Sequence, residues 1–236
     1  MYSIPYGAST ECAFLDYSHQ AGSGSVPSYG AWLKAPAEQI IASMVIVLMI
    51  IPITLTALVT RLTLGPPLLF KQIRIGQNMQ PFTLHKFRTM HDTRDHVGNL
   101  LPDQAREIAI SRFMRKIRVD EFPQLFDIAR GRMSFIGPRP LLPATVEAMG
   151  NLGKLRCRVR PGLSGWAQVN GNTRLSDAQK LALDIWYVDH RSLRFDVLIL
   201  LKTAATLVRG ERIHQRHLAE AETYVAARYC LTKRAN

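Results

Sequence analysis

An apolar run without a single charged residue constrains this chain more than any other feature. No Asp, Glu, Lys or Arg occurs in residues 39–60, and residues 40–51 are almost continuously aliphatic. A helix needs about 20 such residues to cross the hydrocarbon core of a bilayer. The alternative is a buried core helix, but no segment of comparable apolarity is available to cover a helix that is apolar on every side. The sequence therefore predicts that this run is inserted in a membrane.

Pro52 lies in the middle of this run and leaves two topologies open. A proline inside a helix lacks a backbone N–H and clashes with the preceding turn, so the helix kinks or breaks. A straight span would place residues 1–33, which contain no Lys or Arg, outside the cell and the basic remainder in the cytoplasm. A helix broken at Pro52 would instead turn back and leave by the face it entered, with Thr54 and Thr56 bonding the freed carbonyls.

The net charge of +12 indicates anionic partners, which include nucleic acid, phosphorylated metabolites and lipid headgroups. Basic nucleic-acid-binding proteins carry a recognisable recognition module, and none is apparent, so we expect no nucleic-acid partner. A membrane-anchored basic protein without enzymatic activity remains a rival hypothesis. The three cysteines lie far apart and outside any metal-ligand spacing, which indicates reduced thiols in a domain that faces the cytoplasm. They are Cys12, Cys157 and Cys230.

The chain divides into four predicted parts. Residues 1–33 are polar, with a Gly/Ser patch, and are expected to be disordered. Residues 34–62 form the membrane helix broken at Pro52, residues 63–210 form the folded domain, and residues 211–236 form a basic C-terminal tail suited to anionic headgroups.

Alternating apolar and polar residues predict a β-hairpin after the apolar run. The two strands cover Leu69–Ile75 and residues 82–87, and they are separated by the turn-forming residues 76–78. Because side chains alternate along a strand, Lys86 and Arg88 share one face.

Helical periodicity predicts three longer helices in the rest of the domain, over residues 103–116, 176–188 and 196–208. Ser176 and Gln179 have the spacing of a capping box at the start of the second helix. Gly210 ends the third helix, which is too short to span a membrane and lies either at its interface or in the core.

The adjacent carboxylates Asp120 and Glu121 have two interpretations. Because Pro123 opens a helix, Asp120 fits the N-cap position and Glu121 the first turn, with Gly131 as the left-handed cap at the far end. The same helix start is also a site for anions, and a carboxylate beside guanidinium groups such as Arg115 stays ionised and can attack a bound phosphorus. Spacing alone does not decide between them.

Two loops rich in glycine and proline contain further candidates for a ligand site. Pro138 and Pro140 pre-set the backbone on both sides of Arg139 and present its guanidinium at low entropic cost, although a structural turn is the alternative. In residues 161–171, glycines allow close approach of the backbone, and Trp166, Gln168 and Asn170 are suited to hold a base or a sugar.

Together these segments resemble the bacterial sugar transferase family, the monotopic phosphoglycosyl transferases that start exopolysaccharide, capsule and O-antigen assembly. The resemblance runs from about Ala37 to Gly210 and is closest to the short members that initiate exopolysaccharides. The matching segments are residues 86–90, 115–124, 137–140, 160–162, 165–171 and 184–188.

The resemblance implies a reaction and a cofactor. A hexose 1-phosphate of galactose or glucose type passes from a UDP-sugar to undecaprenyl phosphate, and UMP is released. Asp120 attacks the sugar-bearing phosphorus and forms a covalent phosphosugar intermediate, whereas direct transfer in one step is the alternative. Mg²⁺ is required, with Asp120 and Glu121 as its ligands, since Mg²⁺ prefers carboxylate and phosphate oxygens. Glu121 either binds the metal or deprotonates the lipid phosphate.

The resemblance also implies a location and a set of substrate-binding residues. Relatives enter and leave the membrane from the cytoplasmic side at a proline-broken helix, which favours the re-entrant topology at the bacterial inner membrane. We therefore predict an α+β fold with a re-entrant membrane helix, a β-hairpin and a mostly helical catalytic domain that contacts membrane lipid on the cytoplasmic face. Whether the protein forms a homodimer is left open. The residues predicted to bind substrate or phosphate are Lys86, Arg88, Arg115, Pro138, Arg139, Pro140, Gln168 and Asn170.

Overall fold

The structure, a computed structural model, describes residues 31–229, with side chains from residue 33. The described residues form two compact units. The N-terminal unit contains Leu33–Arg74 and Pro81–Met133, and the C-terminal unit contains Ile75–Gln80 and the chain from Ser134 onward. Residues 1–30 of the predicted tail lie outside the described residues, and so do the predicted thiols Cys12 and Cys230, whereas residues 31–33 belong to a helix. The mixture of helices with short strands confirms the predicted α+β class.

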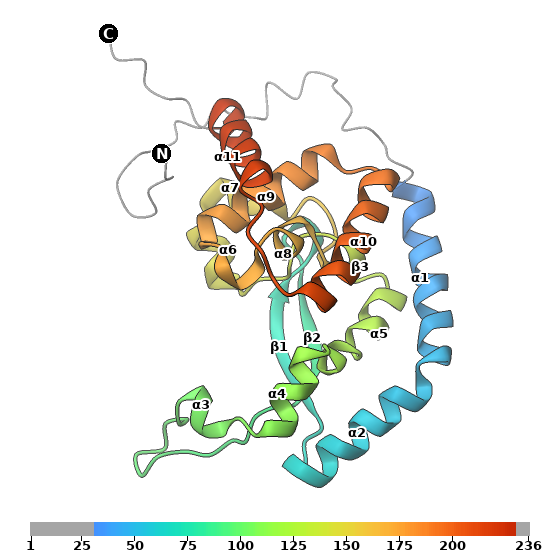
Figure 1. The fold of residues 1–236 in the computed structure, drawn as a ribbon, viewed down its shortest axis with the longest axis vertical. Helices are drawn as coiled ribbons and strands as arrows, with labels where there is room; N and C mark the ends of the chain where they lie inside the picture. The colour runs from blue at the N-terminus through green and yellow to red at the C-terminus, as the bar shows by residue number, and fades with distance from the viewer. Residues whose placement is uncertain (1–30, 230–236) are drawn as a thin grey trace. The chain divides into compact units, whose positions relative to one another are not determined.

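The N-terminal unit consists of a bent helix pair, the two strands of a hairpin up to Arg74 and from Pro81, and short helices (Figure 1). Its elements are α1 (Ala31–Leu48), α2 (Ile50–Leu64), β1 (Leu69–Ile75), β2 (Pro81–Phe87), α3 (Asp103–Arg106), α4 (Ala109–Lys116), the 3₁₀ turn η2 (Val119–Glu121) and α5 (Gln124–Ala129).

The apolar run folds as α1 and α2, which meet at a bend of 65° that Figure 1 shows clearly. The break lies at Met49, which has φ −92° and ψ 10°, three residues before Pro52. Pro52 has no N–H for the carbonyl of Leu48, and its ring crowds that carbonyl, so the helix is interrupted on the N-terminal side of the proline. The Thr54 and Thr56 hydroxyls each donate a 2.8 Å bond to the carbonyl four residues earlier.

No single helix within residues 31–229 has the length and apolar character needed to cross a membrane. The bent pair meets both criteria when its two helices are taken together.

The predicted hairpin is confirmed, because β1 has the predicted bounds and β2 begins one residue early, at Pro81. Its turn is η1 (Gln77–Met79), where Asn78 and Met79 adopt φ angles of 52° and 63°. β2 ends at Phe87, so Arg88 lies beyond the strand.

Two local predictions in the N-terminal unit are wrong. The single helix over residues 103–116 is two helices, because Glu107 and Ile108 adopt extended backbone angles between α3 and α4. Asp120 is not an N-cap. Arg118 adopts a left-handed conformation with φ 58°, which ends the α4 segment and starts the separate turn η2, while Pro123 is the residue that precedes α5. The left-handed Gly131 after α5, with φ 73°, is confirmed.

The C-terminal unit packs helices around a two-stranded parallel sheet. Its remaining elements are β3 (Ser134–Ile136), α6 (Pro143–Ala148), α7 (Gly150–Arg156), β4 (Gly162–Ser164), α8 (Trp166–Val169), η3 (Asn172–Arg174), α9 (Asp177–His190), α10 (Leu193–Arg209) and α11 (Gln215–Tyr229). Ser134 pairs with Gly162 and Ile136 with Ser164. Gly137 and Gly162 approach so closely that a side chain on either would overlap backbone atoms of the other loop.

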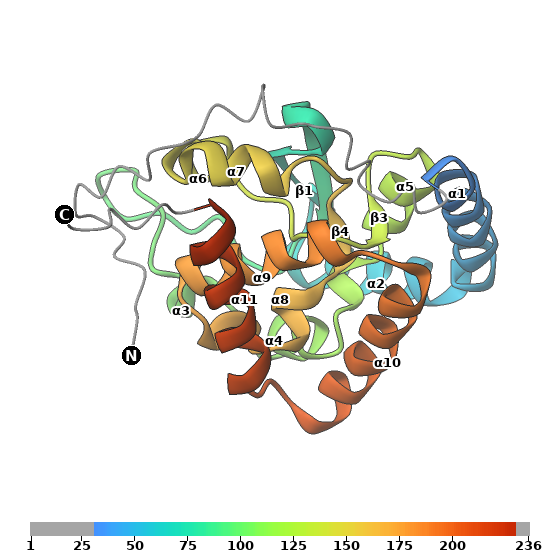
Figure 2. The same ribbon diagram turned by 90° about the horizontal axis from the view of Figure 1, so that it is seen from above.

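The core of this unit lies around α9. The capping box of Ser176 and Gln179 is present at its start, as predicted. Leu183 and Ile185 are buried in the core, and α11 packs along α9 (Figure 2) through Leu218, Ala221 and Val225. Residues 215–229, which fall in the predicted basic tail, therefore form a helix with a buried apolar face.

Candidate functional site

The carboxylates of Asp120 and Glu121 are both buried, each with 8% of its surface exposed. They lie in η2, which packs against α2, β2 and α4. Oε1 of Glu121 accepts a 2.8 Å bond from Nζ of Lys86, and Oε2 lies 3.8 Å from Nη1 of Arg118. Among the described residues, no other residue donates a hydrogen bond to the Asp120 carboxylate. The acidic pair thus consists of one carboxylate tied to cations and one available to a ligand.

The environment of Asp120 raises the pKa of its carboxyl group above the ordinary value. Burial is the largest cause, because it disfavours the charged form, and the neighbouring Glu121 acts in the same direction. The cations Lys86 and Arg115 lower the pKa but do not outweigh these two effects. The two cations therefore only moderate the rise in the pKa of Asp120, whereas the sequence predicts that neighbouring cations keep this carboxylate ionised.

Two arginines predicted to bind substrate or phosphate, Arg115 and Arg88, have contacts within the protein. Arg115 donates a 2.9 Å bond from Nε to the Thr89 hydroxyl and lies 3.2 Å from Glu107. Arg88 is 9% exposed, and its Nη2 donates to the carbonyls of Leu64 and Gly65 at the end of α2. Cations favourably bind the last carbonyls of a helix, so Arg88 joins α2 to the chain after β2.

The acidic pair suits a hard cation. No cluster of three or more His, Cys, Asp or Glu side chains exists within the described part of the chain. Mg²⁺ does not require one, because it commonly uses one or two carboxylates and completes its shell with water and substrate phosphate. Asp120 and Glu121 supply oxygen ligands only, so these residues fit Mg²⁺.

A pocket of about 270 Å³ lies within the C-terminal unit. It is close to the lower end of the range for small-molecule sites, about 300 Å³. Residues from the loop after β3 and from α6, α7, α8, η3 and α9 line it. Among them are Arg139, Arg156, Gln168, Asn172, Thr173 and Asp184.

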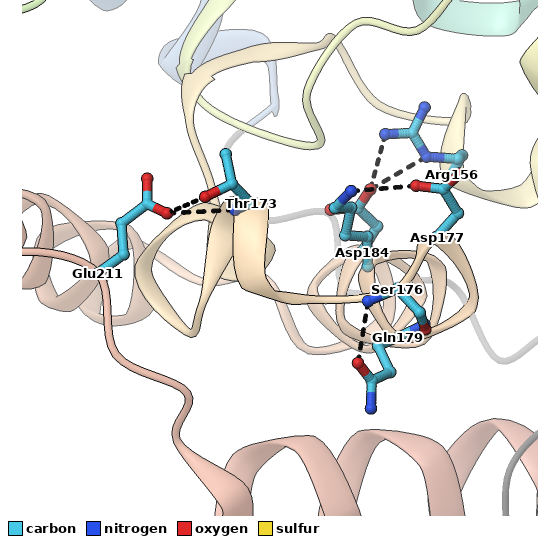
Figure 3. A network of polar contacts seen from close by, with 8 residues as sticks. Arg156, Thr173, Ser176, Asp177, Gln179, Asp184 and Glu211 are labelled. Carbon is cyan, nitrogen blue, oxygen red and sulfur yellow. Dashed lines mark hydrogen bonds and ion pairs between the residues drawn. The ribbon is translucent and has the colours of Figure 1, made fainter. Parts of the chain in front are cut away.

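A buried ion pair supports one wall of this pocket. Arg156 and Asp184 have side chains only 3% and 5% exposed, and Oδ2 of Asp184 accepts bonds of 2.6 and 3.1 Å from the guanidinium (Figure 3). Nη2 of Arg156 also donates a 2.8 Å bond to the carbonyl of Arg139. The ion pair thereby fixes the backbone between Pro138 and Pro140, which are themselves buried.

Gln168 and Asn170 have different environments, although both are buried. Gln168 lines the pocket, and its amide atoms have no hydrogen-bond partner. Such a buried group is energetically unfavourable until a ligand or water satisfies it. Asn170 is fully buried, and its amide donates 2.8 Å to the Trp166 carbonyl and lies 2.7 Å from Nδ1 of His217. Its contacts are those of a residue that holds the loop together.

The predicted site residues fall into two groups, one in each unit. The N-terminal unit contains Lys86, Arg88, Arg115, Asp120 and Glu121. The C-terminal unit contains Pro138, Arg139, Pro140, Gln168 and Asn170.

No role was assigned from the sequence to three residues that support the predicted site in the C-terminal unit, namely Arg156, Asp184 and Glu211. Asp184 belongs to a segment that matched the family, but nothing in that segment indicated its partner Arg156. Glu211, which bonds the loop after α8, lies in the predicted tail and gave no signal, since its contacts depend on the fold.

Comparison with known proteins gives consistent matches. The family described as Bacterial sugar transferase matches residues 29–210. The uncharacterized sugar transferase EpsL of Bacillus subtilis (strain 168) is 43% identical over 175 residues, which are 74% of this chain and 87% of that protein.

Two further relatives have names that state substrates. The UDP-N-acetylgalactosamine-undecaprenyl-phosphate N-acetylgalactosaminephosphotransferase of Aeromonas hydrophila is 34% identical over 83% of this chain and 49% of its own length. The undecaprenyl-phosphate glucose phosphotransferase of Komagataeibacter xylinus is 36% identical over 72% of this chain and 35% of its own length. The chain therefore spans half or less of these two proteins.

Proposed function

The chain belongs to the bacterial sugar transferase family and is a phosphoglycosyl transferase, and we propose that it transfers a sugar 1-phosphate from a UDP-sugar to undecaprenyl phosphate. The names of relatives that act on these substrates support the two substrate classes. The relatives differ in their sugars, and we propose a hexose of galactose or glucose type. The product is a lipid-linked diphosphosugar on which exopolysaccharide or a related glycan is assembled.

We assign the nucleophile to Asp120. The observation that carries this assignment is the contrast within the acidic pair: Glu121 is held by Lys86 at 2.8 Å, whereas the buried Asp120 carboxylate receives no hydrogen bond from another described residue. A carboxylate that is desolvated and lacks donors is a stronger nucleophile than a solvated one.

The proposed reaction has two displacements at one phosphorus. An Asp120 oxygen bonds to the sugar-bearing phosphorus, the bond from that phosphorus to the bridging oxygen breaks, and UMP leaves with the electron pair. An oxygen of the lipid phosphate then attacks the same phosphorus and releases the Asp120 carboxylate. Lys86, Arg88 and Arg115 are the proposed cations for the phosphoryl charge in the N-terminal unit, and Arg139 is the proposed cation for the substrate in the C-terminal unit. Glu121 is proposed either to bind the metal or to take the proton of the lipid phosphate.

We propose Mg²⁺ as the cofactor, held by Asp120 and Glu121. When bound, it neutralises charge on the phosphate oxygens. The oxygen-only donor set of the pair supports this choice. Chelation by EDTA should stop UMP release and added Mg²⁺ should restore it, whereas undiminished release after chelation would argue against a metal.

The pocket of the C-terminal unit is the proposed site for the nucleotide sugar. Arg139 supplies a cation, and the unsatisfied amide of Gln168 offers a donor and an acceptor to a base or a sugar. Pro138 and Pro140 hold the Arg139 backbone, and Asn170 is proposed to hold the loop after α8, whose residues Asn172 and Thr173 line the pocket.

We propose that the bent pair α1 and α2 is re-entrant and anchors the catalytic domain to the cytoplasmic face of the bacterial inner membrane. Apolar side chains on both helices are exposed, including Leu48, Ile51 and Leu62, each more than 70% exposed. Contact with membrane lipid would bury them.

Release of UMP from a panel of UDP-sugars, measured in membranes with undecaprenyl phosphate, tests the proposed function. Wild-type protein should release UMP from at least one UDP-hexose, and Asp120→Asn should abolish release. Asp103→Asn, which alters an exposed carboxylate of the same unit, is the control and should leave release unchanged. Normal release by Asp120→Asn would refute the assigned nucleophile, and no release by wild-type protein from any UDP-sugar would refute the function.

A further inference from the structure

A segment beyond the family match binds the loop between α8 and α9. The match ends at residue 210. Directly after it, Oε1 of Glu211 accepts a 2.5 Å bond from the amide of Asn172. Its Oε2 accepts bonds from the Thr173 hydroxyl at 2.5 Å and from the Thr173 backbone N–H at 3.3 Å (Figure 3). One carboxylate therefore satisfies three donors of the loop.

The start of α11 adds a second set of contacts to the same loop. The backbone N–H of His214 donates 3.3 Å to the Asn170 carbonyl, and Nδ1 of His217 lies 2.7 Å from the Asn170 side-chain oxygen. Because the Asn170 amide nitrogen donates to Trp166, its oxygen faces His217, which must supply the proton from Nδ1. Burial and the cations nearby lower the pKa of His217, so this neutral tautomer prevails at pH 7.

The loop adopts a conformation that needs external support. Gly171 has φ 144° and Asn172 has φ 46°. A side chain at Gly171 would lie 2.9 Å from Leu175 and 3.2 Å from Ile213, so the segment after residue 210 also limits the space around it. Backbone in sparsely populated regions persists where surrounding contacts determine it.

The residues that Glu211 holds form part of the pocket wall. Asn172 and Thr173 line the pocket, together with Arg139 and Gln168. Glu211 is not among the lining residues, so it acts on the pocket through its neighbours.

We propose that Glu211 is a positioning residue that sets the shape of this pocket by clamping Asn172 and Thr173. The identity of the ligand, a UDP-sugar, rests on the proposed function. Because the clamp shapes a wall of the pocket and contains no reacting group, its loss weakens binding of the nucleotide sugar without slowing the chemical step.

The variants Glu211→Ala, Glu211→Gln and Glu220→Ala test this proposal. Glu211→Ala removes all three bonds and should raise KM for the UDP-sugar about tenfold with kcat nearly unchanged, since bonds to a charged acceptor are strong. Glu211→Gln keeps an acceptor oxygen, so its KM for the UDP-sugar should lie between that of the wild type and that of Glu211→Ala. Glu220→Ala removes an exposed acid of α11 and should leave KM unchanged. A fall in kcat at constant KM would indicate general loss of folded enzyme and overturn the proposal.

A double-mutant cycle identifies the route of the effect. Thr173→Val removes the hydroxyl donor, so it should raise KM in wild type and add little in Glu211→Ala, because both changes remove the same bond. Additive effects would contradict the clamp.

Hydrogen exchange separates failure of the clamp from failure of the proposed function. In Glu211→Ala the backbone N–H of Thr173 should exchange at least tenfold faster, while that of Leu218 in α11 stays protected. This measurement needs no substrate. Unchanged exchange at Thr173 would overturn the clamp even if UMP release is observed, and faster exchange would support it even if no UDP-sugar proves to be a substrate.

Discussion

Nζ of Lys86 lies 2.8 Å from Oε1 of Glu121, so a cation expected to contact phosphate is paired with the carboxylate beside the proposed nucleophile. The pair joins β2 to η2 within the N-terminal unit. It places positive charge next to Asp120 without bonding its carboxylate, and it opposes the rise in the pKa of Asp120.

Loss of this cation should change the pH dependence of the reaction. In Lys86→Met, burial and Glu121 act on Asp120 with less opposition, so the pKa of Asp120 rises further. The reaction needs the carboxylate form, hence the acidic limb of kcat/KM for UMP release should move to higher pH. Lys86→Arg keeps the charge and should retain the wild-type limb. An unmoved limb in Lys86→Met would contradict the role given to Lys86.

Removal of the Asp120 charge should stabilise the fold while it abolishes activity. Because the folded pKa is raised, the folded state holds the proton more tightly, and stability falls as pH rises through that pKa. At pH 7 the buried charge is therefore unfavourable, and Asp120→Asn should unfold at a higher temperature than wild type. The difference should shrink below the unfolded pKa of about 3.9. A lower melting temperature for the variant at pH 7 would show that the ionised carboxylate is stabilising.

Breaking the buried ion pair of the C-terminal unit should be strongly destabilising. Asp184→Asn leaves the Arg156 guanidinium buried without its counter-ion, which costs about 3–5 kcal/mol. Asp177→Asn on the same helix breaks an exposed pair with Lys180 and should cost less than about 1 kcal/mol. Urea unfolding measures both. Equal effects of the two variants would show that Asp184 is not held as a buried charge.

Local signals predicted the hairpin and the start of α9 correctly, but not the break between α3 and α4. The hairpin follows from alternation on both sides of a turn, and the start of α9 follows from Ser176 and Gln179, because these patterns involve only neighbouring residues. Pro52 predicted a break but not its position, since the missing bond belongs to the carbonyl four residues earlier and shifts the break to Met49.

Contacts between residues far apart in the chain could not be predicted from the sequence. The strands β3 and β4 are too short for periodicity to reveal, and their pairing depends on close approach of Gly137 and Gly162. The acidic pair was found from its chemistry, whereas the pairing of Glu121 with Lys86 and that of Asp184 with Arg156 emerged only from tertiary packing. Glu211 was missed because nothing near it in the chain indicates a bond to Asn172.

Restoring the helix at Pro52 should change the topology of the proposed anchor. Pro52→Ala supplies the missing N–H for Leu48 and favours one continuous helix across Met49. Pro36→Ala is the control, since Pro36 lies inside α1 without a break. A cysteine at position 25, with Cys12 replaced, should resist an impermeant thiol reagent in intact cells and become labelled only in Pro52→Ala. Labelling without the Pro52 change would refute the re-entrant topology.

Covalent capture of the sugar phosphate tests the central claim most directly. Wild-type protein incubated with Mg²⁺ and the UDP-hexose that supports UMP release, in the absence of undecaprenyl phosphate, should gain the mass of one hexose phosphate. Peptide mapping should place the adduct on Asp120, and Asp120→Asn should gain no mass. If wild-type protein releases UMP in the presence of the lipid but never carries the sugar phosphate, transfer occurs in one step and Asp120 is not the nucleophile.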